Sequence, residues 1–257
     1  MEPVRAKKHL GQHFLKDENV ARKIVDSLTM PGSAVLEIGP GTGVLTKHLL
    51  KLPIEKFLAI DLDWDSIPYL KTTFPEAADS FIEGDFLKIP IDDLFPGNFS
   101  VIGNFPYNIS TQILFRVLEN RNRVPEVVGM FQKEVAERIA APPGSKTYGI
   151  MSVLLQAWFD IEYLFTVSAD VFVPPPKVQS AVIRLKRNQV ESLGCDEKLF
   201  VSIVKTAFNQ RRKTLRNALK SFRFSPDAAL EELLTKRAER LGVEEFVYIT
   251  NRVVEAD

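Results

Sequence analysis

Four short segments rich in carboxylate, amide and aromatic side chains each come directly after an apolar run that is typical of a buried strand. Ligands of open α/β sheets bind beyond the carboxyl ends of the strands, where such segments meet. We therefore expect the four to surround one ligand site. They are residues 37–43 (EIGPGTG), Asp61, residues 84–86 (GDF) and residues 104–107 (NFPY).

The first segment is a glycine-rich turn that begins with a carboxylate. Gly39, Gly41 and Gly43 let the backbone turn sharply and approach a ligand closely. The dinucleotide fingerprint G-x-G-x-x-G serves a pyrophosphate at a helix N-terminus, and here the third glycine comes one residue early. Glu37 would repel a pyrophosphate but suits a ligand with an ammonium and a sulfonium group. The segment favours S-adenosyl-L-methionine over NAD, and a tight turn that merely requires glycine is the alternative.

The second and third segments supply further carboxylates. Asp61 follows the next strand about 20 residues after the glycine turn, where an acid typically accepts two ribose hydroxyls. Asp85 can accept from an adenine amino group with Phe86 packed nearby, although alone it would be interpreted as a turn or cap residue. Asp63 and Asp65 are interpreted as the solvated start of a helix. Together with the glycine turn, these residues predict an adenosyl cofactor.

The fourth segment, Asn104-Phe105-Pro106-Tyr107, predicts methyl transfer to an exocyclic adenine amine. Such an amine is a poor nucleophile because its lone pair is delocalised into the ring. The Asn104 side-chain oxygen and the Phe105 carbonyl can hold its protons out of plane, which localises that lone pair. Pro106 fixes the chain, and Tyr107 offers a face on which an extruded base stacks. A loop with a buried tyrosine and a turn asparagine is the alternative.

Composition and element order indicate the scaffold that must position these residues. The chain of 257 residues is 45% hydrophobic and 26% charged, as in globular proteins. The single Cys195 excludes an intramolecular disulfide and fits a reducing compartment. The N-terminus is basic without an apolar run, and no apolar stretch reaches about eighteen residues, so we expect a soluble cytoplasmic protein with no membrane partner. Trp64 and Trp158 are expected to be packing residues.

Strand-like and helix-like patterns alternate, which predicts an α/β fold with a parallel sheet and helices on both faces. We expect helices at residues 17–28 (capped by Asp17), from the glycine turn to about 52, at 111–118 and at 134–141, and strands at 33–38, 56–60, 80–86, 99–108, 124–132 and 180–187. After Asn188 only helical periodicity remains. We therefore expect a first domain at 1–188 and a small all-helical domain at 189–257.

The net charge is zero, but the cations are clustered. One acid-free run and a basic N-terminal group favour a phosphate-bearing partner, and a solvated helix face is the alternative. His9 and His13 stand four residues apart, yet no metal site is expected because no other ligand is near. The candidate residues for binding such a phosphate-bearing partner are Lys7, Lys8, Lys205, Arg211, Arg212, Lys213, Arg216, Lys220 and Arg223.

The whole chain resembles the bacterial small-subunit ribosomal RNA adenine dimethyltransferase family. The resemblance rests on GQHFLKD, VLEIGPGTG, IDLD, EGDF, GNFPYNIST, FVPPPKVQSAVIRL and AFNQRRKTLRNALK. It implies a Rossmann-like class I methyltransferase sheet that binds S-adenosyl-L-methionine, with a helical RNA- and ribosome-binding domain. It also implies N6,N6-dimethylation of two adjacent adenosines near the 3′ end of 16S rRNA. The expected partner is small-subunit rRNA in an immature 30S-type subunit, bound by a monomer.

The resemblance also places residues. It implies that the target base lies between Tyr107 and Phe172, and it adds His13, Leu15, Leu62 and Asn104 to the cofactor contacts. His13, Asp61 and Phe105 stand where Asn, Glu and Leu are usual in the family. The expected cofactor-binding set is His13, Leu15, Glu37, Gly39, Gly41, Gly43, Asp61, Leu62, Asp85, Phe86 and Asn104.

Two rival functions remain open. The large-subunit rRNA adenine methyltransferases of the macrolide-resistance type share the cofactor turn and the Asn-Pro-Tyr end, but FNQRRKTLRNALK resembles the small-subunit group more closely. A non-catalytic RNA-binding assembly factor on the same fold is the other rival. Such a protein has no need of Asp61, Asp85 and Asn104 together.

Overall fold

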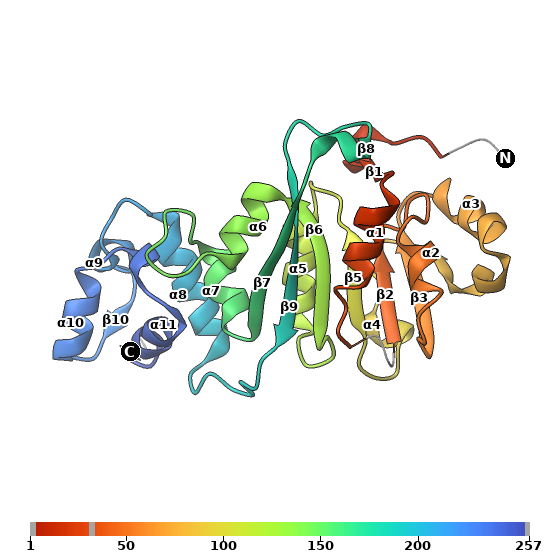
Figure 1. The fold of residues 1–257 in the computed structure, drawn as a ribbon. Helices are drawn as coiled ribbons and strands as arrows, with labels where there is room; N and C mark the ends of the chain where they lie inside the picture. The colour runs from red at the N-terminus through yellow and green to blue at the C-terminus, as the bar shows by residue number, and fades with distance from the viewer. Residues whose placement is uncertain (1–3, 31–33, 255–257) are drawn as a thin grey trace. The chain divides into compact units, whose positions relative to one another are not determined.

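A seven-stranded sheet forms the centre of the computed structural model, which describes residues 4–30 and 34–254 (Figure 1). Its strand order is β4-β3-β2-β5-β6-β9-β7. The first five run parallel, and β9 pairs antiparallel with β6. The strands are β2 (Ala34–Ile38), β3 (Lys56–Asp61), β4 (Phe81–Glu83), β5 (Ser100–Asn104), β6 (Glu126–Gln132), β7 (Phe159–Val167) and β9 (Ser180–Arg187).

The α/β prediction is confirmed, with two corrections to the sheet. The sheet is mixed because β9 is antiparallel, and β7 was not predicted at all. The first strand was expected from Ser33, which lies outside the described residues. The strands β2, β5 and β6 are almost completely buried, which explains why they appear in the sequence as continuous apolar runs.

Helices cover both faces of the sheet, with α1 in front of it and α5 behind it in Figure 1. Asp17 caps α1 as predicted, because its carboxylate accepts the backbone N–H groups of Asn19 and Val20 at 2.8 and 3.0 Å. The helix expected after the glycine turn is only one turn long, since residues 41–45 form turns. The helices here are α1 (Glu18–Val25), α2 (Thr46–Leu49), α3 (Ser66–Thr73), α4 (Ile91–Leu94), α5 (Ser110–Glu119) and α6 (Lys133–Ala140).

The chain divides into two compact units. The first runs to Ala136 and adds Glu162–Arg187, and the second combines Glu137–Ile161 with the residues from Asn188 onward. The segment 137–161, which was expected in the first domain, belongs to the second unit. It joins the second unit because its aromatic side chains pack there, with Trp158 edge-on to Phe200 at 6.1 Å.

The second unit is mainly helical, as expected. It contains α7 (Ile150–Gln156), α8 (Glu197–Asn209), α9 (Leu215–Ala218), α10 (Ala228–Leu234) and α11 (Val243–Thr250). The prediction of an all-helical domain missed a two-residue strand pair, β10 (Arg223–Phe224) with β11 (Val253–Val254). Every helix within residues 4–30 and 34–254 is too short or too polar to cross a bilayer.

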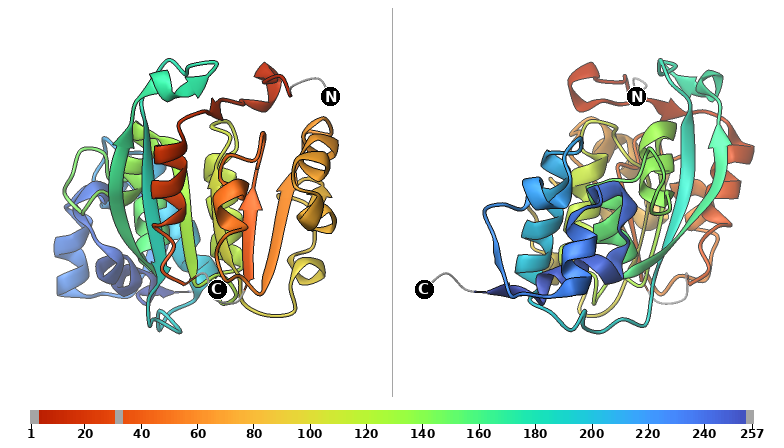
Figure 2. Two further views of the ribbon diagram at one scale, coloured as in Figure 1. Left: turned by 45° about the vertical axis from the view of Figure 1, so that its right-hand side comes forward. Right: turned by 90° about the vertical axis from the view of Figure 1, so that its left-hand side faces the viewer.

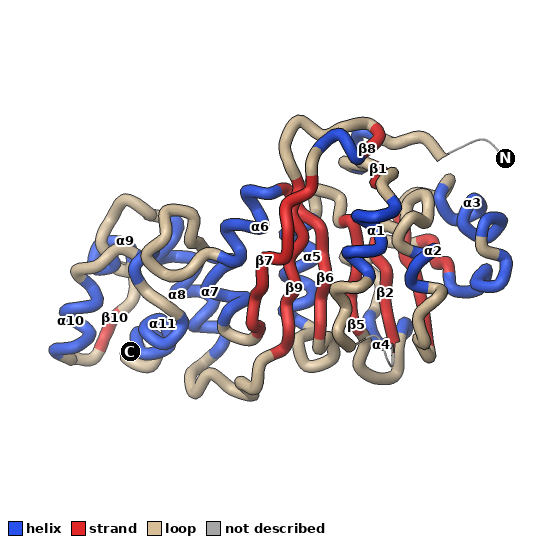
Figure 3. The backbone as a smooth tube through the Cα atoms, viewed as in Figure 1, coloured by secondary structure: helices blue, strands red, loops and turns tan. Residues whose placement is uncertain are grey.

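A layer of short elements lies at the edge where the parallel strands end. Here β1 (Phe14–Leu15) pairs antiparallel with β8 (Phe172–Val173). Residues 4–13, which we call the N-terminal arm, lead into β1 across this edge (Figures 2 and 3). The predicted ligand-binding segments end at the same edge, where residues of the arm lie beside them.

Candidate functional site

Three adjoining hollows open at the carboxyl edge of the sheet. The central cavity is lined by the arm, the glycine turn, Asp61 and residues 104–107. A side slot extends past Asp61 to Leu62 and residues 84–86. An outer pocket extends from His13 and Tyr107 to Gln132 and residues 174–178. The structure thus brings all four sequence-predicted segments together. The glycine turn, Asp61 and residues 104–107 each line both the central cavity and the side slot, whereas residues 84–86 line the side slot alone.

The glycine turn owes its shape to three residues in the left-handed region. Gly39, Gly41 and Gly43 have φ of +68°, +56° and +81°. Gly39 and Gly41 line the central cavity, and a Cβ on Gly41 would lie 2.9 Å from the Phe14 ring. Gly43 faces α3 instead, where a Cβ would lie 2.5 Å from the ring of Phe74. The absence of a side chain at Gly43 therefore lets α3 and Phe74 pack against the turn. Gly43 lines neither the central cavity nor the side slot, so its contact with the cofactor stays a prediction.

Glu37 lies behind the glycine turn and lines none of the three hollows. Its side chain is 1% exposed and accepts the Thr46 hydroxyl at 2.6 Å. Burial raises the pKa of Glu37 to about 8, although the Thr46 hydrogen bond opposes this. The carboxyl is therefore mainly protonated at neutral pH. Glu37 does not reach the hollows in this structure, so its charge pairing with a cationic cofactor stays a prediction.

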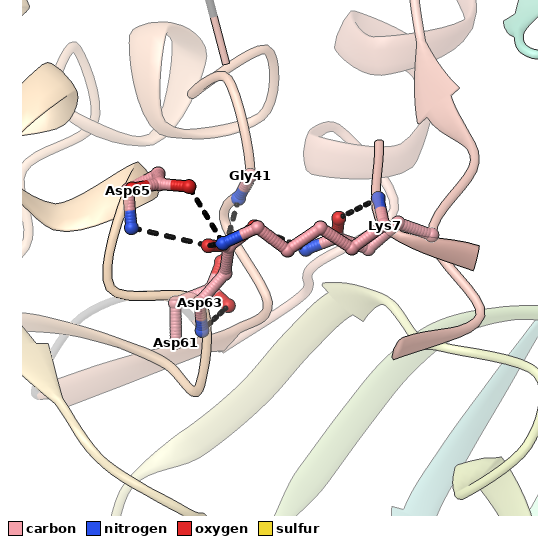
Figure 4. A network of polar contacts seen from close by, with 6 residues as sticks. Lys7, Gly41, Asp61, Asp63 and Asp65 are labelled. Atoms are coloured by element: carbon pink, nitrogen blue, oxygen red, sulfur yellow. Dashed lines mark hydrogen bonds and ion pairs between the residues drawn. The ribbon is translucent and has the colours of Figure 1, made fainter. Parts of the chain in front are cut away.

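Asp61 lies where the central cavity meets the side slot (Figure 4). One carboxylate oxygen accepts the Gly41 N–H at 3.1 Å, and the other accepts the Asp63 N–H at 2.9 Å. Burial raises the pKa of Asp61 to about 6, against the effect of these two hydrogen bonds. Each oxygen keeps a further lone pair for a ligand hydroxyl. The geometry agrees with the predicted role, which it leaves untested.

The residues that line the side slot are mostly apolar, and they include the carboxylate of Asp85. Ile38, Ile60 and Pro106 line it with Phe86, which is 5% exposed. The carboxylate of Asp85 accepts the backbone N–H of Leu87 at 2.9 Å. A purine ring fits such a slot because its faces are apolar and its edge carries an amino donor. The exposed Leu62 lines the same slot.

Asn104 is held by the N-terminal arm. Its side-chain amide nitrogen donates to the His13 carbonyl oxygen at 2.8 Å. Because a carbonyl only accepts, this contact fixes which end of the amide is nitrogen. The Asn104 side-chain oxygen is thereby left as an acceptor at the central cavity.

The ring of Phe105 is a structural wedge, 1% exposed. It packs over Gly103 and Gly129, which are register partners on β5 and β6, and lies edge-on to Phe131 at 5.2 Å. A Cβ on either glycine would lie within 2.7 Å of the ring. The two glycines explain how Phe105 fits here. Its backbone carbonyl, not its side chain, remains the predicted functional group.

Tyr107 lies between the central cavity and the outer pocket. Its hydroxyl is 2.5 Å from the Ser180 hydroxyl, and burial raises its pKa. The ring centroid of His13 lies 5.4 Å away, and the His13 Nδ1 donates to the Pro174 carbonyl at 2.8 Å. His13 thus lines the cavity, and its contact with the cofactor stays a prediction.

Leu15 and Phe172 do not reach these hollows. They are register partners in β1 and β8 and are 3% and 1% exposed in the hydrophobic core. Side chains alternate along a strand, so Val173, 54% exposed, points outward in place of Phe172. In this structure neither side chain lines the hollows, so the roles expected for Phe172 at the target base and for Leu15 at the cofactor stay predictions. The aromatic ring beside Tyr107 is His13.

An acidic turn after β3 holds the arm (Figure 4). The Lys7 amine is 2.5 Å from Asp63 and 2.6 Å from Asp65. Lys7 was expected to bind RNA, but both carboxylates already engage it. Asp63 was expected to be solvated, yet it is 1% exposed, whereas Trp64, expected to pack, is 67% exposed. Trp158 is buried as expected.

The predicted basic run of the second unit has two kinds of member. Arg211 donates to the carbonyls of Lys146 and Tyr148, at 2.5 and 2.8 Å, and Arg216 pairs with Glu231 at 2.5 Å, so both are structural. Lys205 also has a contact within the chain. We call the remaining members the exposed cations, because the structure gives them no ion pair among the described residues: Arg212, Lys213, Lys220 and Arg223.

Similar proteins support a single family. Residues 4–253 match the family described as ribosomal RNA adenine dimethylase. A curated protein from Cytophaga hutchinsonii named ribosomal RNA small subunit methyltransferase A is 60% identical, over 98% of each chain. A dimethyladenosine transferase from Plasmodium falciparum has a similar solved structure, with TM-score 0.79, 26% identity and coverage of 94% of this chain and 99% of that one. The structure of a 23S rRNA methyltransferase, ErmE, shares the fold at TM-score 0.71 and 22% identity, covering 93% of this chain and 100% of its own.

Proposed function

The chain belongs to the ribosomal RNA adenine dimethylase family, and on that premise we propose that it transfers methyl groups from S-adenosyl-L-methionine to N6 of adenosines in small-subunit (16S) rRNA. The finer proposal is N6,N6-dimethylation of two adjacent adenosines near the 3′ end. One observation carries the chemistry: the Asn104 amide is pinned by the His13 carbonyl so that its oxygen remains an acceptor at the cavity that Asp61 borders.

The residues around Asp61 fit the cofactor. The Asp61 carboxylate would accept the ribose hydroxyls, and the side slot would hold the adenine with Asp85 at its amino edge. Gly39 and Gly41 would let the backbone lie against the amino-acid end, since neither carries a Cβ. Bound there, S-adenosyl-L-methionine supplies an electrophilic methyl group on its sulfonium.

The chain activates and orients the amine. The Asn104 side-chain oxygen and the Phe105 carbonyl would accept its two protons, while the Tyr107 ring stacks on the base. Holding an amine and a methyl donor in line is an orientation effect, so no strong general base is needed. After one transfer a single proton remains, and the second transfer would rely on one acceptor and on stacking.

We propose that the second unit contributes rRNA binding through its exposed cations, and that the first performs the transfer. The partner would be rRNA within an immature 30S-type subunit in the cytoplasm, with the protein acting as a monomer. The large-subunit rival is disfavoured because the 60% identical relative carries the small-subunit name, whereas ErmE at 22% identity supports the fold alone. The non-catalytic rival is disfavoured because Asp61, Asp85 and Asn104 are all present at the hollows.

The test uses purified protein, S-adenosyl-L-methionine with a labelled methyl group, and undermethylated small subunits, with large subunits as a parallel substrate. Mapping by primer extension and nucleoside mass spectrometry should find two adjacent dimethyladenosines near the 3′ end of 16S rRNA. The matched Asn104→Ala protein should leave them unmodified. Label in large subunits, or none in either substrate, would contradict the proposal.

A further inference from the structure

The N-terminal arm forms part of every hollow at the site. Gln12 lines the central cavity, the side slot and the outer pocket, and Gly11 and Leu10 add to them. The backbone carbonyl of His13 also orients Asn104. The contacts that hold the arm in position therefore determine the shape of the hollows in which the cofactor and the target base would bind.

Asp63 gathers the contacts that fix the arm (Figure 4). One of its carboxylate oxygens lies 2.5 Å from the Lys7 amine, and the other accepts the Gln12 side-chain amide at 2.9 Å. The backbone N–H of Lys7 donates to the side-chain oxygen of Gln12 at 2.8 Å, so Lys7 and Gln12 are also joined to each other. The Asp63 N–H meanwhile donates to Asp61 at 2.9 Å, so one residue joins the arm to the carboxylate at the cavity.

The Asp63 side chain at this contact is fully buried, with an exposed fraction of 0% against 23% for Lys7. Burial alone would raise the pKa of Asp63, but hydrogen bonds from Lys7 and Gln12 hold it below its ordinary value. A buried charge that loses a partner is left uncompensated, which is costly. Asp63 therefore binds the arm only while both donors are in place.

We propose that Asp63 is a positioning residue that holds the N-terminal arm across the cavity and thereby sets the affinity for the cofactor. The inference rests on the proposed function, because it concerns the same cofactor. A ligand that needs the closed arm binds with an apparent Kd equal to its intrinsic Kd divided by the fraction of closed protein. If the closed fraction falls from near one to about one tenth, the Kd rises about tenfold.

Asp63→Asn removes the charge and one of the acceptors while keeping the shape of the side chain. Lys7→Met removes the same ion pair from the arm side, together with the pair between Lys7 and Asp65, and it serves if Asp63→Asn fails to fold. Matched controls are Asp79→Asn and Lys51→Met, because both residues are exposed and have no ion pair among the described residues. The double variant Lys7→Met/Asp63→Asn measures whether the two changes act on one interaction.

Two readouts follow the arm and the cofactor separately. Calorimetric titration with S-adenosyl-L-homocysteine should show about a tenfold higher Kd in both single variants, no further loss in the double variant and no change in the controls. Trp64 is exposed with the Lys7 amine 5.5 Å from its ring centroid, whereas Trp158 is buried. Quenching of Trp64 by acrylamide, which carries no charge, should therefore increase in Asp63→Asn and return towards the wild-type value when the ligand saturates.

Steady-state kinetics distinguishes positioning from general support of the fold. In Asp63→Asn the KM for S-adenosyl-L-methionine should rise about tenfold with kcat within about twofold, since the saturating cofactor restores the closed arm. An unchanged Kd in both single variants, when the wild type binds, would overturn this inference alone. Loss of kcat with unchanged KM would also overturn it. Failure of the wild type to bind S-adenosyl-L-homocysteine would instead overturn the proposed function together with it.

Discussion

Glu37→Gln tests the buried acid that sequence reasoning assigned to the cofactor. The carboxyl is 1% exposed, has Thr46 as its side-chain partner and has a pKa raised by burial from 4.5 to about 8. Between pH 4.5 and about pH 8, Glu37 therefore keeps its proton in the folded protein but has released it in the unfolded chain. Stability is therefore highest below pH 4.5 with respect to this group, falls as pH rises towards 8 and is constant above that.

The magnitude follows from the size of the shift. Each pKa unit corresponds to about 1.36 kcal/mol, so the rise to about 8 amounts to about 5 kcal/mol of stability lost by pH 8. Glutamine has nearly the same shape and keeps an oxygen that can accept the Thr46 hydroxyl. The variant should therefore match the wild type near pH 4.5 and exceed its unfolding free energy increasingly up to pH 8, with about 5 kcal/mol as the upper bound.

Urea unfolding of wild type and variant between about pH 5 and about pH 9 measures this difference. Glu76→Gln, at an exposed position, is the control and should run parallel to the wild type. Titration with S-adenosyl-L-homocysteine should give the same Kd for Glu37→Gln and wild type, because Glu37 lines none of the hollows. Parallel stability curves would refute the buried-acid reasoning. A clearly weakened affinity would restore the cofactor contact expected from the sequence.

Three further predictions follow from other contacts. Asn104→Ala should bind S-adenosyl-L-homocysteine by calorimetry yet transfer methyl groups about 10²–10³-fold more slowly, because one acceptor for the amine is lost. Near wild-type turnover would contradict that role. If the exposed cations meet phosphates, small-subunit affinity measured over a salt series should fall with a log–log slope of about −3 to −4, and a flat dependence would exclude them as the contact. Arg211→Ala should lower the unfolding free energy measured in urea by about 1.5–3 kcal/mol through two lost hydrogen bonds, whereas Arg212→Ala should change it by less than about 0.5 kcal/mol. Equal effects of the two substitutions would contradict the distinction between structural and exposed cations.

The order of elements was predictable because it depends on local periodicity. The strand at 180–187 and the cap at Asp17 were correctly predicted, since alternation and capping are read within a few residues. The nine-residue edge strand β7 was missed because strand pairing is a long-range property, and the β10–β11 pair was missed because two-residue strands leave no pattern. The helix after the glycine turn was overestimated because apolar spacing alone does not show where turns end.

The location of the candidate site was predictable from the sequence, but the contacts of its individual side chains were not. Sequence reasoning located Asp61, Asp85 and Asn104 at strand ends, and the structure brings them to adjoining hollows. It did not foresee that the side chains of Glu37 and Phe172 are buried in the interior. Whether a side chain at a strand end faces a ligand or the core depends on the neighbouring elements, which one segment does not specify.

By itself, therefore, the sequence determined the chemistry: carboxylates, a glycine turn and an Asn-Phe-Pro-Tyr segment placed after successive strands of a parallel sheet. Only the tertiary structure decided which of these groups can reach a ligand. It buried Glu37 and Phe172, and it used Lys7 to tie the arm to Asp63 across 56 positions of the chain. Burial and ion pairing join residues distant in sequence, so the assignment of each group follows from packing and not from local pattern.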